Sequence, residues 1–255
     1  MFKKDDLVII KDDENTIVYV IIEISNDFVL LKGYTYRIIR KVNIDRIELA
    51  TTRQIEKETK EKERYIDFNK NQTRNSKKTI LGTILHIDGD EEYLGSCMDF
   101  YQSMHIYAWG IYIKEKDING KILAILKELT PDIVVITGHD AYNGQGIKDL
   151  NNYENSKKYV DVVRTIRSSY SKDDLVVIVG ACASHFEALI ASGANFASSP
   201  ARINIHTYDP AVVAAKVAST SCNKVINFES VIKHIKEGRD AFGGIETKGK
   251  MRILY

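Results

Sequence analysis

The stretch Asp174-Leu175-Val176-Val177-Ile178-Val179-Gly180-Ala181 leads directly into Cys182, and the similar stretch Asp132-Ile133-Val134-Val135-Ile136-Thr137-Gly138 leads into His139. Each is a continuous apolar run, rich in β-branched residues and followed by glycine, which is typical of a strand buried on both faces of a parallel sheet. Ligands of open α/β sheets bind beyond the carboxyl ends of the strands. If the two strands are neighbours, a thiol and an imidazole meet at that edge, as in enzymes with a cysteine nucleophile and a histidine base.

Residues 79–255 are expected to form an α/β unit around these two runs. Apolar strand patterns alternate there with helical ones, which favours a mostly parallel, Rossmann-like sheet with flanking helices. Strands are predicted at 80–87, 106–113, 133–137, 175–179, 195–197 and 203–206. Helices are predicted at 91–103, 118–129, 155–170, 184–191, 211–219 and 228–237. Glycines at 243, 244 and 249 predict a final hairpin running to Tyr255.

Residues 1–78 have a different character. Five short strand patterns, at 7–10, 17–24, 28–33, 36–42 and 47–49, predict a small SH3-like β-barrel over residues 1–50. Such a barrel suits docking or oligomerisation. Residues 51–78 alternate in charge and then become polar, which predicts a solvated helix and a flexible linker, with a docking helix as the alternative.

Composition narrows the class of protein. The 255 residues carry a formal net charge of +1, which favours neither nucleic acid nor an anionic membrane as a partner. The apolar runs are too short to span a bilayer, and residues 1–20 lack a secretion signal. Three widely spaced cysteines suit a reducing compartment. We therefore expect a soluble cytoplasmic protein, and the sequence is silent on its oligomeric state.

Cys182 and His139 are the candidate catalytic residues. Cys182 precedes a predicted helix, where unpaired backbone N–H groups favour a thiolate. The alternatives are a small buried side chain for Cys182 and a surface turn for His139. His185, three residues after Cys182, is a second candidate base, although its position on the same turn leaves little room for a substrate carbonyl.

Further residues at the same predicted edge are candidates for supporting roles. Gly138 and Asp140 flank His139, where backbone amides could stabilise an oxyanion and Asp140 could orient the imidazole or cap the loop. Candidates for the substrate pocket are Asp88, Asp90, Asp149, Ser198 and Ser199. The first two could instead bind a cation or cap the next helix. With no Cys-x-x-Cys or His-x-x-x-His motif, no metal and no cofactor are expected.

Several long strings resemble one known family. These strings are Ile84–Asp90, Ile136–Tyr142, Gly180–Glu187, Gly193–Pro200 and Gly243–Thr247. They resemble the YabG family of sporulation-specific cysteine peptidases over nearly the whole chain, and more distantly the caspase, legumain and gingipain clan. That clan has His-Gly where this chain has His139-Asp140.

The resemblance implies a caspase-like sheet and an intracellular cysteine endopeptidase of sporulating cells. Such an enzyme would cleave spore coat and cortex-associated proteins as the spore matures, either free in the cytoplasm or associated with the developing coat. Carried over by position, Cys182 would be the nucleophile and His139 the general base.

Two other classes of function stay open at this point. Asp88 and Asp90 after the first strand, and the run 131–136, also suit a degenerate receiver-like signalling domain without catalysis. Against this, the strand that should carry a phospho-accepting aspartate ends in Thr137-Gly138-His139. A non-catalytic scaffold is the third possibility.

Overall fold

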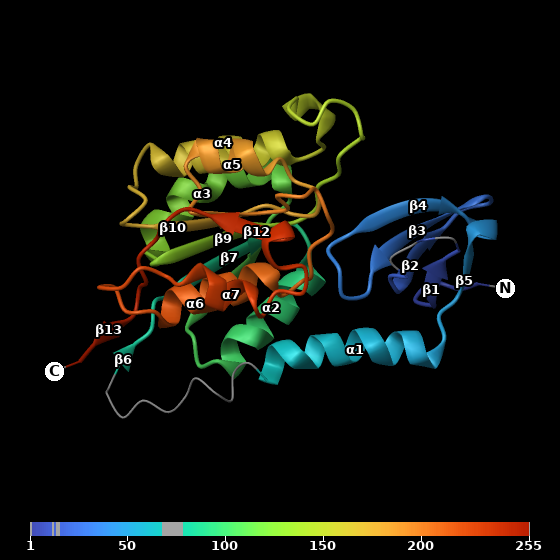
Figure 1. The fold of residues 1–255 in the computed structure, drawn as a ribbon. Coiled ribbons are helices and arrows are strands. Elements are labelled where there is room, and N and C mark those ends of the chain that lie inside the picture. The colour runs from blue at the N-terminus through green and yellow to red at the C-terminus, as the bar shows by residue number, and fades with distance from the viewer. Residues whose placement is uncertain (1, 12, 14–15, 68–78, 255) are drawn as a thin grey trace.

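The computed structural model describes residues 2–11, 13, 16–67 and 79–254, and the side chains of 62–67 are not part of the description. Figure 1 shows an antiparallel N-terminal sheet beside a layered α/β part, with one long helix running alongside both. The fold is therefore α/β with an additional all-antiparallel sheet. Within the described ranges, no helix is both long and apolar enough to cross a membrane.

The N-terminal sheet has five antiparallel strands in the order β4-β3-β2-β1-β5. Their bounds are β1 Leu7–Ile10, β2 Tyr19–Ile24, β3 Phe28–Gly33, β4 Ile39–Asn43 and β5 Ile47–Leu49. All five lie where the sequence predicts strands, because alternating apolar residues and polar turns define them clearly. An SH3-like closure of this sheet stays a prediction.

The central sheet has the order β12-β11-β10-β9-β7-β8. Its strands are β7 Ile84–Asp88, β8 Ala108–Tyr112, β9 Ile133–Thr137, β10 Val176–Val179, β11 Phe196–Ser198 and β12 Phe242–Gly244. The first five run parallel, and β12 joins the edge antiparallel to β11. The expectation that β9 and β10 are buried neighbours is confirmed.

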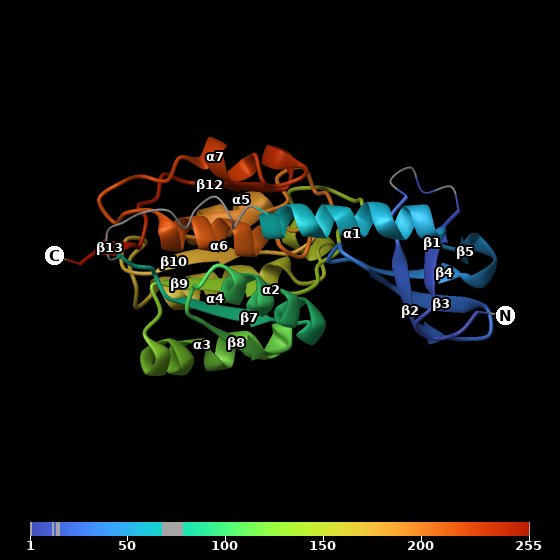
Figure 2. The ribbon, with the colours of Figure 1, turned by 90° about the horizontal axis from the view of Figure 1, so that it is seen from below.

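Helices cover both faces of the central sheet (Figures 1 and 2). One face carries α2 Glu91–Ser103, α6 Asp209–Ser219 and α7 Phe228–Ile232, and the other carries α3 Glu115–Leu129, α4 Ser156–Arg167 and α5 Phe186–Ser192. The apolar cluster under α2 and α6 continues into the N-terminal sheet. The two sheets therefore share one core.

The charged helix α1, Thr52–Asp67, contacts both parts of the fold through single carboxylates. Glu58 is 5% exposed and accepts hydrogen bonds from Val18 N at 2.7 Å and Thr35 Oγ1 at 2.8 Å. Glu61 pairs with Lys236 at 2.9 Å. Its first turns are thus docked rather than solvated, and the predicted flexible stretch at 68–78 lies outside the described residues.

Two predictions about local structure are wrong. Residues 203–206 form no strand apart from an isolated bridge between Tyr36 and His206. Their apolar side chains are explained by burial in an irregular segment. The predicted C-terminal hairpin is also absent among the described residues, since β12 pairs with β11 while β13, Arg252–Ile253, pairs with β6, Thr79–Ile80.

Candidate active site

Three neighbouring strands of the central sheet end in register. Ile87 of β7 pairs with Ile136 of β9, and Ile136 pairs with Val179 of β10. Three residues further along each strand come Asp90, His139 and Cys182. β8 lies on one side of β7, whereas β9, β10 and β11 follow on the other side. The strand order therefore reverses between β7 and β9, and open α/β sheets bind ligands at such a switch point.

The His139 and Cys182 side chains lie on the same face of the sheet. Cys182 belongs to the apolar cluster beneath α2 and α6. The His139 ring lies against the ring of Tyr93 on α2, with 5.8 Å between the centroids. The structure therefore brings the two candidate catalytic residues to register-equivalent positions, at one edge and on one face.

The His139 imidazole is held by one carboxylate and has one unused nitrogen. Nε2 lies 3.0 Å from Oδ2 of Asp90, whereas Nδ1 is buried with no hydrogen-bond partner among the described residues. The His139 backbone is fixed as well, because its N–H donates to Glu115 Oε1 at 2.8 Å and its carbonyl accepts from Asn155 at 2.8 Å. Nδ1 is thus the nitrogen left to accept a proton.

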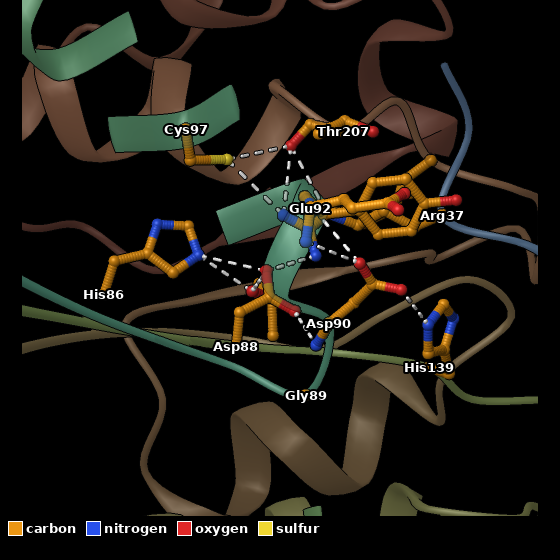
Figure 3. A network of polar contacts seen from close by, with 12 residues as sticks. Arg37, His86, Asp88, Gly89, Asp90, Glu92, Cys97, His139 and Thr207 are labelled. Carbon is orange, nitrogen blue, oxygen red and sulfur yellow. Dashed lines mark hydrogen bonds and ion pairs between the residues drawn. The ribbon is translucent and has the colours of Figure 1, made fainter. Parts of the chain in front are cut away.

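Asp90 contacts His139 at the start of α2 (Figure 3), and through Lys32 it is also joined to the N-terminal sheet. Oδ1 accepts from Lys32 Nζ at 2.8 Å and from the backbone N–H groups of Glu92 and Tyr93, so Asp90 is the N-cap of α2. Burial opposes ionisation, but the hydrogen bonds from His139 and Lys32 outweigh it and hold the pKa of Asp90 well below its usual range.

Asp88 lies behind Asp90 in a fully buried ion pair. Its Oδ2 accepts from Arg37 Nη1 at 2.6 Å and Thr137 Oγ1 at 2.7 Å, and its Oδ1 accepts from Asp90 N at 3.0 Å. Burial opposes ionisation, but the Arg37 charge and hydrogen bonds from His86 and Thr137 lower the pKa of Asp88 to about 2. With both side chains 0% exposed, Asp88 supports the site internally and faces no substrate in this state.

The Cys182 thiol is covered in this structure. It is 2% exposed, its sulfur accepts from Ile205 N at 3.2 Å, and burial raises its pKa to about 12. The expected helix N-terminus at Cys182 is wrong, because α5 begins only at Phe186. A turn intervenes in which Ala183 has the uncommon φ of 54°.

We call residues 203–207 the cover segment, because they lie over this thiol. The Ile205 carbonyl accepts from Arg37 N at 3.1 Å, and Thr207 N donates to Thr35 O at 2.9 Å. The cover segment is therefore bonded to Cys182 on one side and to the loop between β3 and β4 on the other.

The Asp140 carboxylate binds neighbouring loop residues instead of the His139 imidazole. Its Oδ2 accepts from Ser156 Oγ at 2.5 Å and Ser184 Oγ at 3.0 Å, while Oδ1 accepts from Asn155 N at 2.7 Å. Burial is the main influence and raises the pKa of Asp140. Of the two roles proposed for Asp140, these bonds match loop capping, and the orienting contact belongs to Asp90.

The remaining candidates make local structural contacts. Ser198 Oγ donates to Ala181 O at 2.8 Å, and Ser199 Oγ donates to Ile203 O at 2.6 Å, so these serines fix the chain beside Cys182 and in the cover segment. Gly138 lies where a side chain would overlap Glu115. Exposed Asp149 caps the short helix at Leu150–Asn152.

His185, the second candidate base, has both ring nitrogens engaged. Nδ1 accepts from Ala188 N at 3.3 Å and caps α5, and Nε2 lies 3.2 Å from Lys148 O. It therefore acts as a helix cap. Across the described ranges there is also no group of three or more His, Cys, Asp or Glu arranged to hold a metal ion.

Known proteins provide an independent comparison with this geometry. The model of a family described as YabG peptidase U57 matches residues 3–255. The chain belongs to the YabG peptidase family. It is also 43% identical over 208 residues to the sporulation-specific protease YabG of Bacillus subtilis strain 168, a match covering 80% of this chain and 72% of that protein.

Membership of the YabG family identifies the chain as a peptidase and links it to sporulation proteases. It does not favour the receiver-like alternative. Neither does the structure, since Asp88 is enclosed with Arg37 and Asp90 caps a helix while binding His139. The predicted strings around β7, β9 and β10 are the segments that build this edge of the sheet.

Proposed function

We propose that this YabG-family peptidase is a cysteine endopeptidase in which Cys182 is the nucleophile and His139 the general base. The observation that carries this proposal is the shared register of β9 and β10, which gives both side chains equivalent positions on one face. A thiol and an imidazole in such a relation are the two groups that cysteine proteolysis needs.

The proposed reaction uses the unpartnered nitrogen of His139. Nδ1 takes the proton from the Cys182 thiol, and the sulfur attacks the scissile carbonyl carbon to form a tetrahedral oxyanion. When this intermediate collapses, the peptide C–N bond breaks and the imidazolium gives its proton to the leaving amine. Water, deprotonated by the same nitrogen, then hydrolyses the thioester and regenerates the thiol.

Catalysis also requires the cover segment to move, because Cys182 is only 2% exposed and a substrate carbonyl has no access to its sulfur. The structure thus corresponds to a resting state. The outer side of the cover segment, at Ile203 and Asn204, lines a hollow of about 140 Å³ next to Tyr36 and Lys236. Burial is the largest cause of the raised pKa of Cys182, with a smaller contribution from the Asp209 charge, so uncovering the thiol should lower this pKa.

We further propose that the substrates are spore coat and cortex-associated proteins and that the enzyme acts in the cytoplasm of the sporulating cell. The name of the B. subtilis relative supports the link to sporulation. The boundaries 1–50, 51–78 and 79–255, the SH3-like closure and the caspase-like sheet belong to the same proposal. The parallel strand order β8-β7-β9-β10-β11 supports its last part.

A comparison of two cysteine variants tests the proposed nucleophile. Cys182→Ala should abolish cleavage of a peptide library and of extracted coat proteins, while circular dichroism shows the fold intact. Cys222→Ala is the matched control, since Cys222 is partly exposed and lies outside the three strand ends. Cleavage that persists in Cys182→Ala, or that is lost in Cys222→Ala alone, would refute the proposed nucleophile.

A further inference from the structure

We propose that Asp90 is the positioning carboxylate of His139 and that Lys32 of the N-terminal sheet holds this carboxylate in place. The inference rests on the cysteine peptidase chemistry proposed above. It gives the N-terminal sheet a part in the catalytic machinery in addition to any docking role.

The hydrogen bonds of Asp90 determine which imidazole nitrogen carries a proton. A carboxylate accepts hydrogen bonds, so Nε2 of His139 must be the N–H that donates to Oδ2 across 3.0 Å. In the neutral ring the lone pair is therefore on Nδ1, which has no hydrogen-bond partner in the described part of the chain. An ionised carboxylate at Nε2 also stabilises the imidazolium that forms when the thiol loses its proton.

Asp90 itself is rigidly held. Oδ1 accepts from Lys32 and from two backbone N–H groups at the start of α2, while its own backbone N–H donates to Asp88. The bonds to α2 also place the positive end of the helix dipole beside the carboxylate. Asp90 can therefore fix the ring orientation of His139, which a mobile carboxylate could not do.

Lys32 is a buried cation whose position suits this task. Lys32 as a whole is 8% exposed. Its ammonium group lies 4.4 Å from the centre of the Tyr93 ring, the same ring that contacts His139. Lys32 also pairs with Glu92 at 2.6 Å, but the Glu92 side chain is 81% exposed. Burying a lysine costs free energy unless it is paired, and Asp90 supplies the buried partner.

Several other polar groups surround His139 and Asp90 and are shared by every variant compared below. They are Glu115 at the His139 N–H, Tyr159 at its carbonyl, Tyr93 at its ring, and the Arg37–Asp88 pair behind Asp90. None of them contacts Nε2. A change in pH dependence after substitution of Asp90 can therefore be assigned to the carboxylate.

Asp90→Asn is the direct test, because asparagine caps a helix about as well as aspartate and keeps the side-chain volume. We expect kcat for a library-derived peptide to fall at least about 10-fold, the upper bound being the roughly 10⁴-fold loss known for the equivalent change in a serine protease triad. KM should change little, since Asp90 contacts no substrate. The acid limb of the kcat/KM profile, where the base becomes protonated, should move to lower pH, because the imidazolium loses its stabilising carboxylate.

Glu92→Gln is the matched control, because Glu92 binds the same lysine without touching His139. It should retain kcat within about twofold, as expected for an exposed ion pair. Lys32→Met keeps an apolar stem but removes the cation, and we expect kcat to fall about 3- to 10-fold through a less firmly held carboxylate.

The outcomes separate this proposal from the one on which it rests. Loss of activity in Cys182→Ala together with an impaired, pH-shifted and well-folded Asp90→Asn supports both. If Cys182→Ala is inactive but Asp90→Asn keeps wild-type kcat and an unmoved acid limb, the positioning role is overturned while the nucleophile stands. A fully active Cys182→Ala overturns the chemistry itself.

Discussion

The sulfur of Cys182 accepts a hydrogen bond from the backbone N–H of Ile205 at 3.2 Å, and the carbonyl of the same Ile205 accepts one from Arg37 N at 3.1 Å. One residue of the cover segment thus connects the candidate nucleophile with the N-terminal part of the fold. Burial shields the thiol and, by raising its pKa to about 12, keeps it protonated.

The covered thiol predicts slow alkylation in the resting protein. Because burial raises the pKa of Cys182 to about 12, iodoacetamide at pH 8 should modify it at least about 10-fold more slowly than an ordinary exposed thiol. Cys222, which is partly exposed, provides that reference within the same chain. Mass spectrometry of peptides taken at timed intervals measures both rates.

Cys97 is the internal control for this experiment, since it is also fully buried and its pKa is likewise raised to about 12 by burial. Like Cys182, Cys97 should stay unmodified by iodoacetamide in the folded protein, and urea should expose both thiols. Equal rates at Cys182 and Cys222 in the folded protein would show that the thiol is not covered in solution.

The Arg37–Asp88 ion pair predicts a loss of stability in acid. The pKa of Asp88 is lowered to about 2 in the folded chain, so its contribution is present above its ordinary value near 4 and disappears as the pH falls towards 2. The lost contribution should be roughly 2 kcal/mol. Urea unfolding at intervals between pH 6 and 2 measures it.

In Arg37→Met, ionisation of Asp88 should destabilise the folded protein instead of stabilising it. A buried carboxylate without its cation has a raised pKa, and the variant should lose about 3–5 kcal/mol at neutral pH but recover part of it on acidification. An Arg37→Met protein with the wild-type acid profile would mean that the pair does not control Asp88.

Gly180, directly after β10, has little room for a side chain. Its φ of +121° disfavours other residues, and an added Cβ would overlap Ser198 Oγ. Gly180→Ala should therefore lower the free energy of unfolding by about 2–4 kcal/mol. In the background of Ser198→Gly the cost should shrink, because the overlap with Ser198 is removed while the backbone strain and a close contact with Leu189 remain. An unchanged cost would contradict the steric explanation.

Substitution of the two histidines near Cys182 should separate chemistry from capping. His139→Ala removes the proposed base and should reduce kcat/KM for a peptide substrate at least about 10²-fold. His185→Ala removes the α5 cap and should lower stability by about 1 kcal/mol while turnover of the folded enzyme persists. The reverse pattern of activities would identify His185 as the base.

Much of the central sheet can be predicted from sequence because its strands are continuous apolar runs. The edge at which Cys182 and His139 both lie follows from those runs, since parallel strands end on the same side. The sequence also contains a signal for Asp90. Asp90, His139 and Cys182 each lie three positions after a buried isoleucine or valine of β7, β9 or β10, and these three apolar residues are in register. Read across strands, that spacing aligns Asp90 with His139.

The contributions of Lys32 and Arg37 could not be predicted in the same way. Both come from the N-terminal sheet, more than 50 residues before their partners, and a single basic residue in a polar loop or strand gives no sign of burial. The cover segment was mistaken for a strand because its apolar residues are buried against Cys182 rather than paired in a sheet.

The most direct measurement is the site of covalent trapping by a peptidyl acyloxymethyl ketone, a substrate-like reagent that forms a thioether when a thiolate displaces its carboxylate. Peptide mapping after incubation at pH 7.5 should find the adduct on Cys182 in the wild-type protein, with little adduct in His139→Ala. An adduct confined to Cys222, or full inactivation with Cys182 unmodified, would contradict the assignment of Cys182 as the nucleophile.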